Sequence, residues 1–237
     1  MTVSLHSLRE GYRALVIGAS GSIGQALVQA LRADPRCSQV HACSRGQPLA
    51  WDLRDEASLA ALAARLQAQL PEPLHLVLDA TGALQIDGHG PEKNLQALQA
   101  EPLLASLQVN AVGPALLLRH LSPLLARGER VIWGKLSARV GSIEDNHKGG
   151  WYGYRAAKAA LNQLLQTAAI ELARQRPLAV VAALQPGTVR SALSAPFVGE
   201  AASEPALAAQ GLLQALDAAP ATGRALFLDH RGEPIAW

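Results

Sequence analysis

Tyr154 and Lys158 stand four positions apart in the alanine-rich run GWYGYRAAKAA, residues 150–160. Alanine favours a helix, and residues four apart in a helix lie on one face, so the pattern predicts a phenol and an ammonium group that point into the same space. A phenol has a reference pKa of about 10, and a cation held nearby favours the phenolate. A fixed lysine together with a positively charged cofactor would supply the ~4 kcal/mol that a shift of ~3 pKa units needs. The same spacing also occurs on ordinary surface helices, so the rest of the chain decides between proton transfer and a solvated helix face.

A glycine-rich turn near the N-terminus is the second group of residues whose types and spacing indicate a functional site. The predicted strand at 13–18 leads into GASGSIG, residues 18–24, and a helix is predicted at 22–33. Glycines allow the backbone to approach a pyrophosphate, and the free amides and dipole of a helix N-terminus stabilise its charge. This placement between a strand and a helix favours dinucleotide binding over a plain tight turn. The residues predicted to bind there are Gly18, Ser20, Gly21, Ser22, Ile23 and Gly24.

Length and composition predict one domain, residues 1–237. The chain has 237 residues, 49% of them apolar and 17% charged, which suffices for one sizeable core. A formal charge of +2 with scattered basic residues argues against a nucleic-acid partner. No uninterrupted apolar run approaches ~18 residues, and residues 1–11 lack the features of a signal peptide. We therefore expect a cytoplasmic protein that does not bind a membrane.

The cysteines and histidines do not predict a metal site. Cys37 and Cys43 have no metal-ligand spacing with a histidine, and Cys43 lies in a predicted buried strand. Both are interpreted as reduced, structural thiols. The seven histidines include no H-E-x-x-H or comparable cluster.

Strand and helix patterns alternate along the whole chain. This alternation predicts an α/β fold of the Rossmann type, with a doubly wound, mostly parallel sheet of about seven strands flanked by helices. Ligands of such sheets bind at the carboxyl ends of the strands. Strands are predicted at 13–18, 39–44, about 49–52, 74–79, 129–135, 178–184 and 225–228, and helices at 22–33, 55–69, about 101–126, 151–175 and 203–217.

Taken together, these residues resemble the short-chain dehydrogenase/reductase family nearly end to end. The segment 137–152 and the C-terminal PIAW are most similar to the branch of C-factor-like and related carbonyl reductases. The family landmarks occur in order: the glycine turn, Asp52-Leu53, Asp79-Ala80-Thr81-Gly82, Asn110, Tyr154 and Lys158, and Pro186-Gly187-Thr188-Val189.

The resemblance implies a role for each landmark. Tyr154 would be the general acid or base that protonates a carbonyl oxygen as hydride arrives from the nicotinamide. Lys158 would bind the nicotinamide ribose and lower the pKa of the tyrosine. Asn110 would hold the local helix geometry and a water that links Lys158 to solvent; alternatively, it is a polar residue satisfied within a helix. The cofactor would also contact Asp52, Leu53, Ala80, Thr81, Gly82, Pro186, Gly187, Thr188 and Val189.

The end of the second predicted strand favours NADP(H) over NAD(H). An NAD site usually places a carboxylate about 20 residues after the glycine turn, where this chain has Ser44 and Arg45. A guanidinium group pairs with a 2′-phosphate through charge-assisted hydrogen bonds. The alternative is that Arg45 is a solvated loop residue.

Two positions depart from the family pattern. The fifth residue of the glycine turn is Ser22 rather than glycine, a spacing that still suits a pyrophosphate. The catalytic serine normally stands three residues before Gly141, and that position is Ala138. Ser142 follows the glycine and is the candidate replacement. Ser137 is expected to point away, because adjacent strand side chains face opposite sides. The alternatives are that Ser137 nevertheless replaces the missing serine, or that neither serine does.

The sequence therefore predicts an NADP(H)-dependent short-chain oxidoreductase that acts on a carbonyl or alcohol substrate. Its substrate loops are expected at about 136–150 and 188–201, with Trp151 and Tyr152 nearby, and the resemblance favours a homodimer or homotetramer. A dinucleotide-binding regulatory or signalling protein with little or no turnover is the competing hypothesis, since the usual serine is missing. A purely structural protein is less consistent with the set of Tyr154, Lys158 and Asn110.

Overall fold

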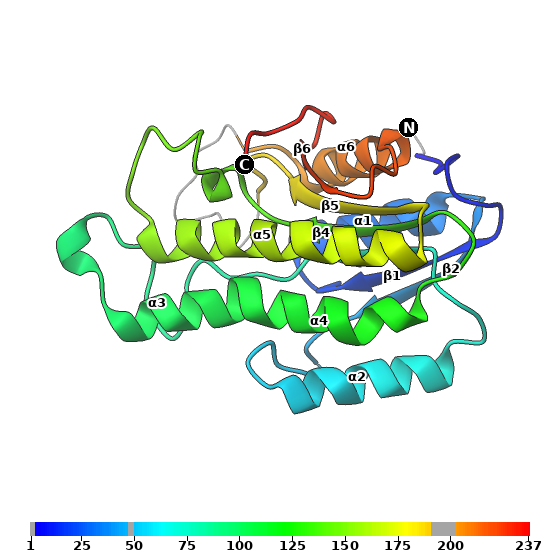
Figure 1. The fold of residues 1–237 in the computed structure, drawn as a ribbon, viewed down its shortest axis with the longest axis horizontal. Coiled ribbons are helices and arrows are strands. Elements are labelled where there is room, and N and C mark those ends of the chain that lie inside the picture. Colours follow the sequence, from blue (N-terminus) through cyan, green and yellow to red (C-terminus); the bar gives the residue numbers. More distant parts are fainter. Residues whose placement is uncertain (1–2, 47–49, 191–201) are drawn as a thin grey trace.

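A computed structural model describes residues 3–46, 50–190 and 202–237. Its parallel strands form one sheet in the order β2-β1-β3-β4-β5-β6 (Figure 1). Strand order reverses between β1 and β3, the second and third strands of this sheet, and ligands of such sheets bind beyond the strand ends at this point. The strands are β1 (Tyr12–Ile17), β2 (Cys37–Cys43), β3 (Leu76–Asp79), β4 (Val131–Leu136), β5 (Ala179–Gln185) and β6 (Ala225–Asp229).

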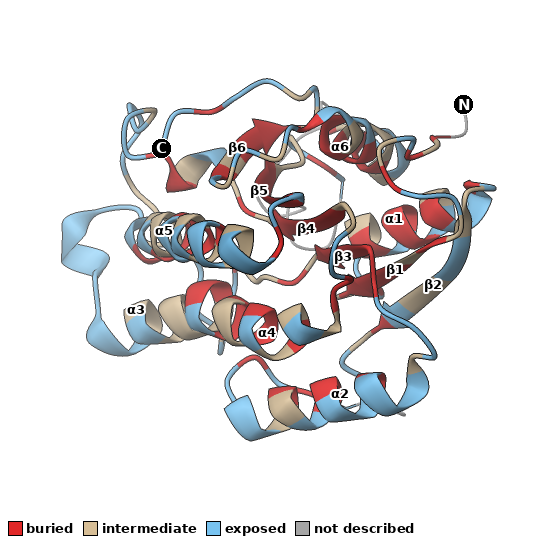
Figure 2. Ribbon diagram, turned by 45° about the vertical axis from the view of Figure 1, so that its right-hand side comes forward, coloured by how far each residue is buried: buried red, intermediate tan, exposed pale blue. Residues whose placement is uncertain are grey.

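Helices cover both faces of the sheet, whose strands are buried between them except for the partly exposed edge strand β2 (Figure 2). Alternate side chains of one strand enter two separate cores, because successive residues of a strand point to opposite faces. Leu15 and Ile17 belong to the core under α2, α4 and α5, whereas Ala14 and Val16 belong to the core under α1 and α6. The helices are α1 (Ser22–Ala33), α2 (Glu56–Gln69), α3 (Ala100–Leu107), α4 (Gly113–Leu121), α5 (Tyr152–Gln175) and α6 (Pro205–Ala218).

The strand predicted at about 49–52 does not form in its described part, residues 50–52. Trp51 is buried there through its side chain, and its indole Nε1 donates to the carbonyl oxygen of Ser44 at 3.0 Å. The apolar signal at this position therefore reflects a tryptophan packed beside the sheet rather than a strand in the ladder. The described sheet consequently has six strands where about seven were predicted. The fold class is confirmed.

The helix predicted at about 101–126 is interrupted in the middle. A π-helical turn, η2 (Gln108–Val112), joins α3 to α4, and a short 3₁₀ turn, η3 (Ser122–Leu124), ends the stretch. A Cβ atom at Gly113 would lie 2.5 Å from the carbonyl oxygen of Leu53, so glycine allows α4 to approach the loop before α2. By length and composition Ala100–Leu124 could cross a membrane, but its buried side chains at Leu117 and Leu121 belong to the core.

Candidate active site

A cavity of about 590 Å³ opens beyond the carboxyl ends of β4 and β5. The segments that follow these two strands form part of its wall, and the start of α5 forms another part. This is the position that a doubly wound sheet offers to a ligand. The lining residues are Ile23, Leu84, Ser137, Ala138, Arg139, Val140, Lys148, Gly149, Trp151, Tyr154, Arg155, Gln185, Pro186, Gly187, Thr188 and Val189.

Tyr154 projects from the first turn of α5 into this cavity. The Trp151 ring meets its ring edge-on, with centroids 6.2 Å apart. Burial raises the pKa of the Tyr154 phenol to about 12. A phenol with this pKa is protonated at neutral pH, so Tyr154 is able to donate a proton to a substrate.

Lys158 lies one helical turn further along α5 and is buried. Its Nζ is 5.5 Å from the centroid of the Tyr154 ring and donates to the carbonyl oxygen of Leu136 at 3.1 Å. Burial and the nearby cation of Lys135 hold the pKa of Lys158 well below its usual range. The protein's own groups therefore do not lower the pKa of Tyr154, because burial disfavours the charged form of both groups; the predicted lowering also required the positive charge of the cofactor.

Asn110 lies in the π-helical turn η2 and is completely buried. Its Oδ1 accepts from the backbone N–H of Ala83 at 2.9 Å, and its Nδ2 donates to the Ala83 carbonyl oxygen at 2.9 Å. A Cβ atom at Gly82 would lie 3.3 Å from Asn110 Oδ1 and 3.5 Å from Lys158 Nζ. Asn110 thus fastens the loop after β3 to the helical layer at the point where Gly82 passes Lys158.

A buried network that sequence reasoning missed lies beneath this loop. Lys135 Nζ donates to the carbonyl oxygen of Thr81 at 2.6 Å and forms an ion pair of 3.2 Å with Asp79 Oδ1. The same carboxylate oxygen accepts from the backbone N–H and the hydroxyl group of Thr81, at 2.9 and 2.6 Å. Asp79 and Lys135 are register partners on the neighbouring strands β3 and β4. A lysine in the apolar strand pattern VIWGKL was the signal that could have revealed the pair.

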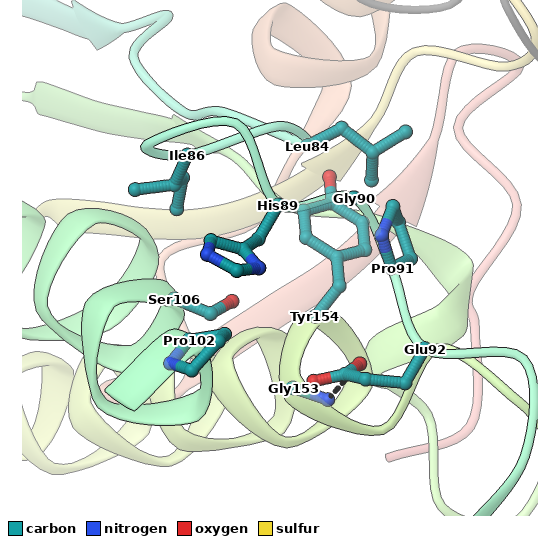
Figure 3. A pocket seen from close by; sticks show the side chains of 10 residues that line it. All are labelled: Leu84, Ile86, His89, Gly90, Pro91, Glu92, Pro102, Ser106, Gly153 and Tyr154. Atoms are coloured by element: carbon teal, nitrogen blue, oxygen red, sulfur yellow. Dashed lines mark hydrogen bonds between the residues drawn. The ribbon is translucent and has the colours of Figure 1, made fainter. Parts of the chain in front are cut away.

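Glu92 caps the N-terminus of α5 from a distant loop. Its carboxylate accepts from the backbone N–H of Gly153 at 2.9 Å, as Figure 3 shows, and its backbone oxygen accepts from Trp151 N–H. Trp151 itself adopts a left-handed conformation, with φ of 56°, and supplies no side-chain cap. A cavity of about 20 Å³ lies between this loop and the Tyr154 ring. The cap comes from 61 residues away, so no local sequence pattern could have indicated it.

The glycine turn has the geometry that a dinucleotide requires. Gly18 has φ of 79°, and a Cβ atom there would lie 3.0 Å from the backbone carbon of Ala80. A Cβ atom at Gly24 would lie 2.2 Å from the Gly18 carbonyl oxygen. Gly21 and Ser20 are exposed at the start of α1, whose first amides are free to meet an anion. The structure therefore brings the turn against Ala80 and Thr81, and these residues fit a bound pyrophosphate.

The remaining residues predicted to bind the cofactor fall into three groups. Pro186, Gly187, Thr188 and Val189 line the cavity after β5. Ser44 and Arg45 follow β2, and the Arg45 side chain is exposed without a hydrogen bond or ion pair to any described residue. Asp52 and Leu53, in the loop that leads to α2, differ in environment: Leu53 is buried, whereas the exposed Asp52 accepts from Arg54 N–H at 2.9 Å.

The serines near the cavity are placed differently from the sequence expectation. Ser142 does not line the cavity; its hydroxyl group donates to the Trp237 carbonyl oxygen at 3.3 Å and accepts from Asp145 N–H at 3.0 Å. Its hydroxyl holds the loop, which corrects the expectation that it reaches back toward a substrate. Ser137 is among the residues that line the cavity, but it is buried and its hydroxyl group donates to Asn162 Oδ1 on α5 at 2.7 Å. Ala138 lines the cavity with a methyl group.

The two predicted substrate loops are described to different extents. The first loop contributes residues 137–140, Lys148 and Gly149 to the cavity wall, and Trp151 before α5 also lines the cavity, whereas Tyr152 does not. The greater part of the second loop, residues 191–201, lies outside the described residues. The cysteines of β2 are both free thiols, as predicted, and Cys43 is buried.

Comparison with known proteins identifies a matching family model and several relatives. A family model described as enoyl-(acyl carrier protein) reductase matches residues 18–229. A 1-hydroxy-2-glutathionyl-2-methyl-3-butene dehydrogenase from Rhodococcus sp. (strain AD45) is 32% identical over 167 residues, which cover 70% of this chain and 69% of that protein. The C-signal protein of Myxococcus xanthus is 29% identical over 129 residues, which cover 54% of this chain and 75% of that protein.

Solved structures share the fold over almost the whole chain. The NADPH-bound carbonyl reductase from chicken fatty liver superimposes with a TM-score of 0.81 and 22% sequence identity, covering 97% of this chain and 100% of that chain. At this identity the similarity shows the fold alone.

Proposed function

Because this chain belongs to the short-chain dehydrogenase/reductase family, we propose that it is an NADP(H)-dependent oxidoreductase that interconverts a carbonyl and an alcohol. The observation that supports the proposal most directly is the placement of Tyr154 in the wall of the 590 Å³ cavity, with Lys158 one turn behind it. A proton donor in a cavity beside a dinucleotide turn is the arrangement that carbonyl reduction needs. We place the protein in the cytoplasm as a homodimer or homotetramer, with no nucleic acid or membrane as partner.

Each residue has a defined task in the proposed reaction. A nicotinamide cofactor, when bound, would supply the hydride that the carbonyl carbon accepts in the reductive direction. Tyr154 donates its phenolic proton to the carbonyl oxygen, so that the products are an alcohol and a tyrosinate that is reprotonated from solvent. Lys158 stabilises the tyrosinate by its charge, and Asn110 holds the loop at Gly82 against Lys158. In the oxidative direction the tyrosinate accepts the proton of the alcohol.

Arg45 is proposed to set the cofactor preference. We expect NADPH to bind more tightly than NADH, and Arg45→Ala to narrow the difference by roughly 1–3 kcal/mol, the usual worth of a charge-assisted hydrogen bond. Fluorescence titration of both cofactors measures the two affinities. Arg54→Ala is the matched control, because Arg54 is also exposed but pairs with Asp87. Equal affinities in the parent protein would reject the role of Arg45.

Ala138 is proposed to limit turnover, because the cavity has a methyl group where a hydroxyl donor to the substrate oxygen is usual. One such donor is worth ~3–4 kcal/mol of transition-state stabilisation. We expect Ala138→Ser to raise kcat/KM on simple aldehydes by at least ~10-fold. Ser142→Ala is expected to leave the chemical step nearly unchanged, because that hydroxyl holds the loop. A fall in kcat/KM for Ala138→Ser, in a protein of unchanged melting temperature, would contradict the prediction.

A regulatory protein with little turnover is the second candidate function. Ala138 and the similarity to a protein named C-signal favour it. NADPH absorbance followed with a panel of aldehydes and ketones, beside a fluorescence titration of NADPH, separates the two. Binding with turnover supports the oxidoreductase, and binding without turnover supports the regulator.

A further inference from the structure

Three basic residues line the cavity, and they come from segments other than those proposed to bind the cofactor. Arg139, Lys148 and Arg155 belong to residues 139–155, whereas Ile23 and residues 185–189 form the cofactor side. Among the described residues that line the cavity there is no aspartate or glutamate. On the basis of the proposed function, we propose that the substrate is a carbonyl or alcohol that also carries an anionic group such as a carboxylate, bound by Arg155 and Lys148.

Arg155 carries a fixed charge at the edge of this wall. Its guanidinium group donates to the carbonyl oxygens of Gly150, Val140 and Gly149, at 2.9, 3.3 and 3.3 Å. These partners are uncharged, so they orient the group without neutralising it, and no described carboxylate forms an ion pair with it. A guanidinium group has five N–H donors, and the three bonds leave two for a ligand. A preorganised arginine of this kind binds a carboxylate with little loss of conformational entropy.

Lys148 and Arg139 differ in how far their charges are compensated. Lys148 is exposed at the cavity and forms no hydrogen bond or ion pair with the rest of the described chain. Arg139 pairs with Asp145 at 3.4 Å and lies 3.9 Å from Asp229. Arg139 therefore contributes less to the field in the cavity, and the uncompensated charge comes from Arg155 and Lys148. Such a field attracts anionic ligands and repels cationic ones.

Matched aldehydes test the inference. 4-Carboxybenzaldehyde, its methyl ester and a 4-formylbenzyl trimethylammonium salt present the same reacting group with a negative, a neutral and a positive substituent. We expect kcat/KM to fall in that order, with the carboxylate preferred over the ester by on the order of 10-fold. The difference should lie in KM rather than kcat, because the anionic group is remote from the reacting carbon. Raising the ionic strength should reduce the preference.

Variants locate the charge that causes the preference. Lys148→Gln is expected to reduce kcat/KM for the carboxylate several-fold and to leave the ester unchanged. Lys93→Gln is the matched control, because Lys93 is exposed and does not line the cavity. Arg155→Gln should reduce kcat/KM for the carboxylate more strongly than Lys148→Gln does. If loss of the Arg155 hydrogen bonds disturbs the loop that carries Gly149 and Gly150, the Lys148→Gln variant still decides the test.

The outcomes separate this inference from the function on which it rests. A kcat/KM for the ester equal to or above that for the carboxylate would overturn the inference of an anionic substrate. An equal effect of Lys148→Gln on kcat/KM for the two aldehydes would also overturn it. Either result would leave the proposed oxidoreductase function intact. Absence of turnover for all three aldehydes, despite NADPH binding, would overturn the proposed function and this inference with it.

Discussion

Replacing Tyr154 with phenylalanine is expected to lower carbonyl turnover by at least ~100-fold and to leave NADPH binding largely intact. The substitution removes the transferable proton and keeps the ring that packs against Trp151. Because burial raises the pKa of the phenol to about 12, the parent residue is protonated across the neutral range and is ready to donate. Steady-state kinetics with one aldehyde and fluorescence titration of NADPH measure the two effects separately.

Tyr152→Phe is the matched control for this experiment. Tyr152 stands two residues earlier on α5, is exposed and does not line the cavity, so its loss should leave turnover unchanged. Lys158→Ala should damage both turnover and cofactor binding, because the ammonium group serves both. Near-normal turnover by Tyr154→Phe, where chemistry limits the rate, would show that another group donates the proton.

Sequence patterns predicted the elements of the fold because each depends on local periodicity. The helix from Ser22 to Ala33 follows directly from the glycine turn and its apolar spacing, and α5 begins one residue from its predicted start. The strand predicted at about 49–52 was wrong for its described part, since a short apolar run with a buried tryptophan resembles a strand. The break between α3 and α4 was missed because a π-helical turn keeps the apolar character of the helices on either side.

The site was predicted less completely than the fold, because much of it depends on contacts between distant segments. Tyr154 and Lys158 share one helix, so their relation could be read from spacing. The hydrogen bonds of Asn110 with Ala83 and of Glu92 with Gly153 join residues far apart in the sequence. The environment of Ser142 depends on a contact with Trp237, and no local pattern indicates that its hydroxyl is already engaged.

Lys135→Met is expected to destabilise the protein by about 3–5 kcal/mol, the cost of breaking a buried ion pair by removing one partner. Both side chains are almost completely buried, and Asp79 Oδ2 has no hydrogen-bond partner among the described residues. Loss of the ammonium group therefore leaves a buried carboxylate without its compensating cation. Urea unfolding of the parent and the variant measures the free energy of unfolding.

The double substitution Lys135→Met with Asp79→Asn separates loss of charge balance from loss of packing. An asparagine keeps an oxygen that accepts from Thr81 and carries no charge, so we expect the double variant to recover most of the lost stability. Arg54→Met is the control at the surface: the Arg54–Asp87 pair is exposed, and its loss should cost less than ~1 kcal/mol. A double variant no more stable than Lys135→Met would show that packing rather than charge causes the loss.

The same double variant tests whether the Lys135–Asp79 pair also positions the Asp79–Gly82 loop. If it does, the double variant should bind NADPH more weakly than the parent at equal stability, because the Lys135 bond to the Thr81 carbonyl oxygen is absent.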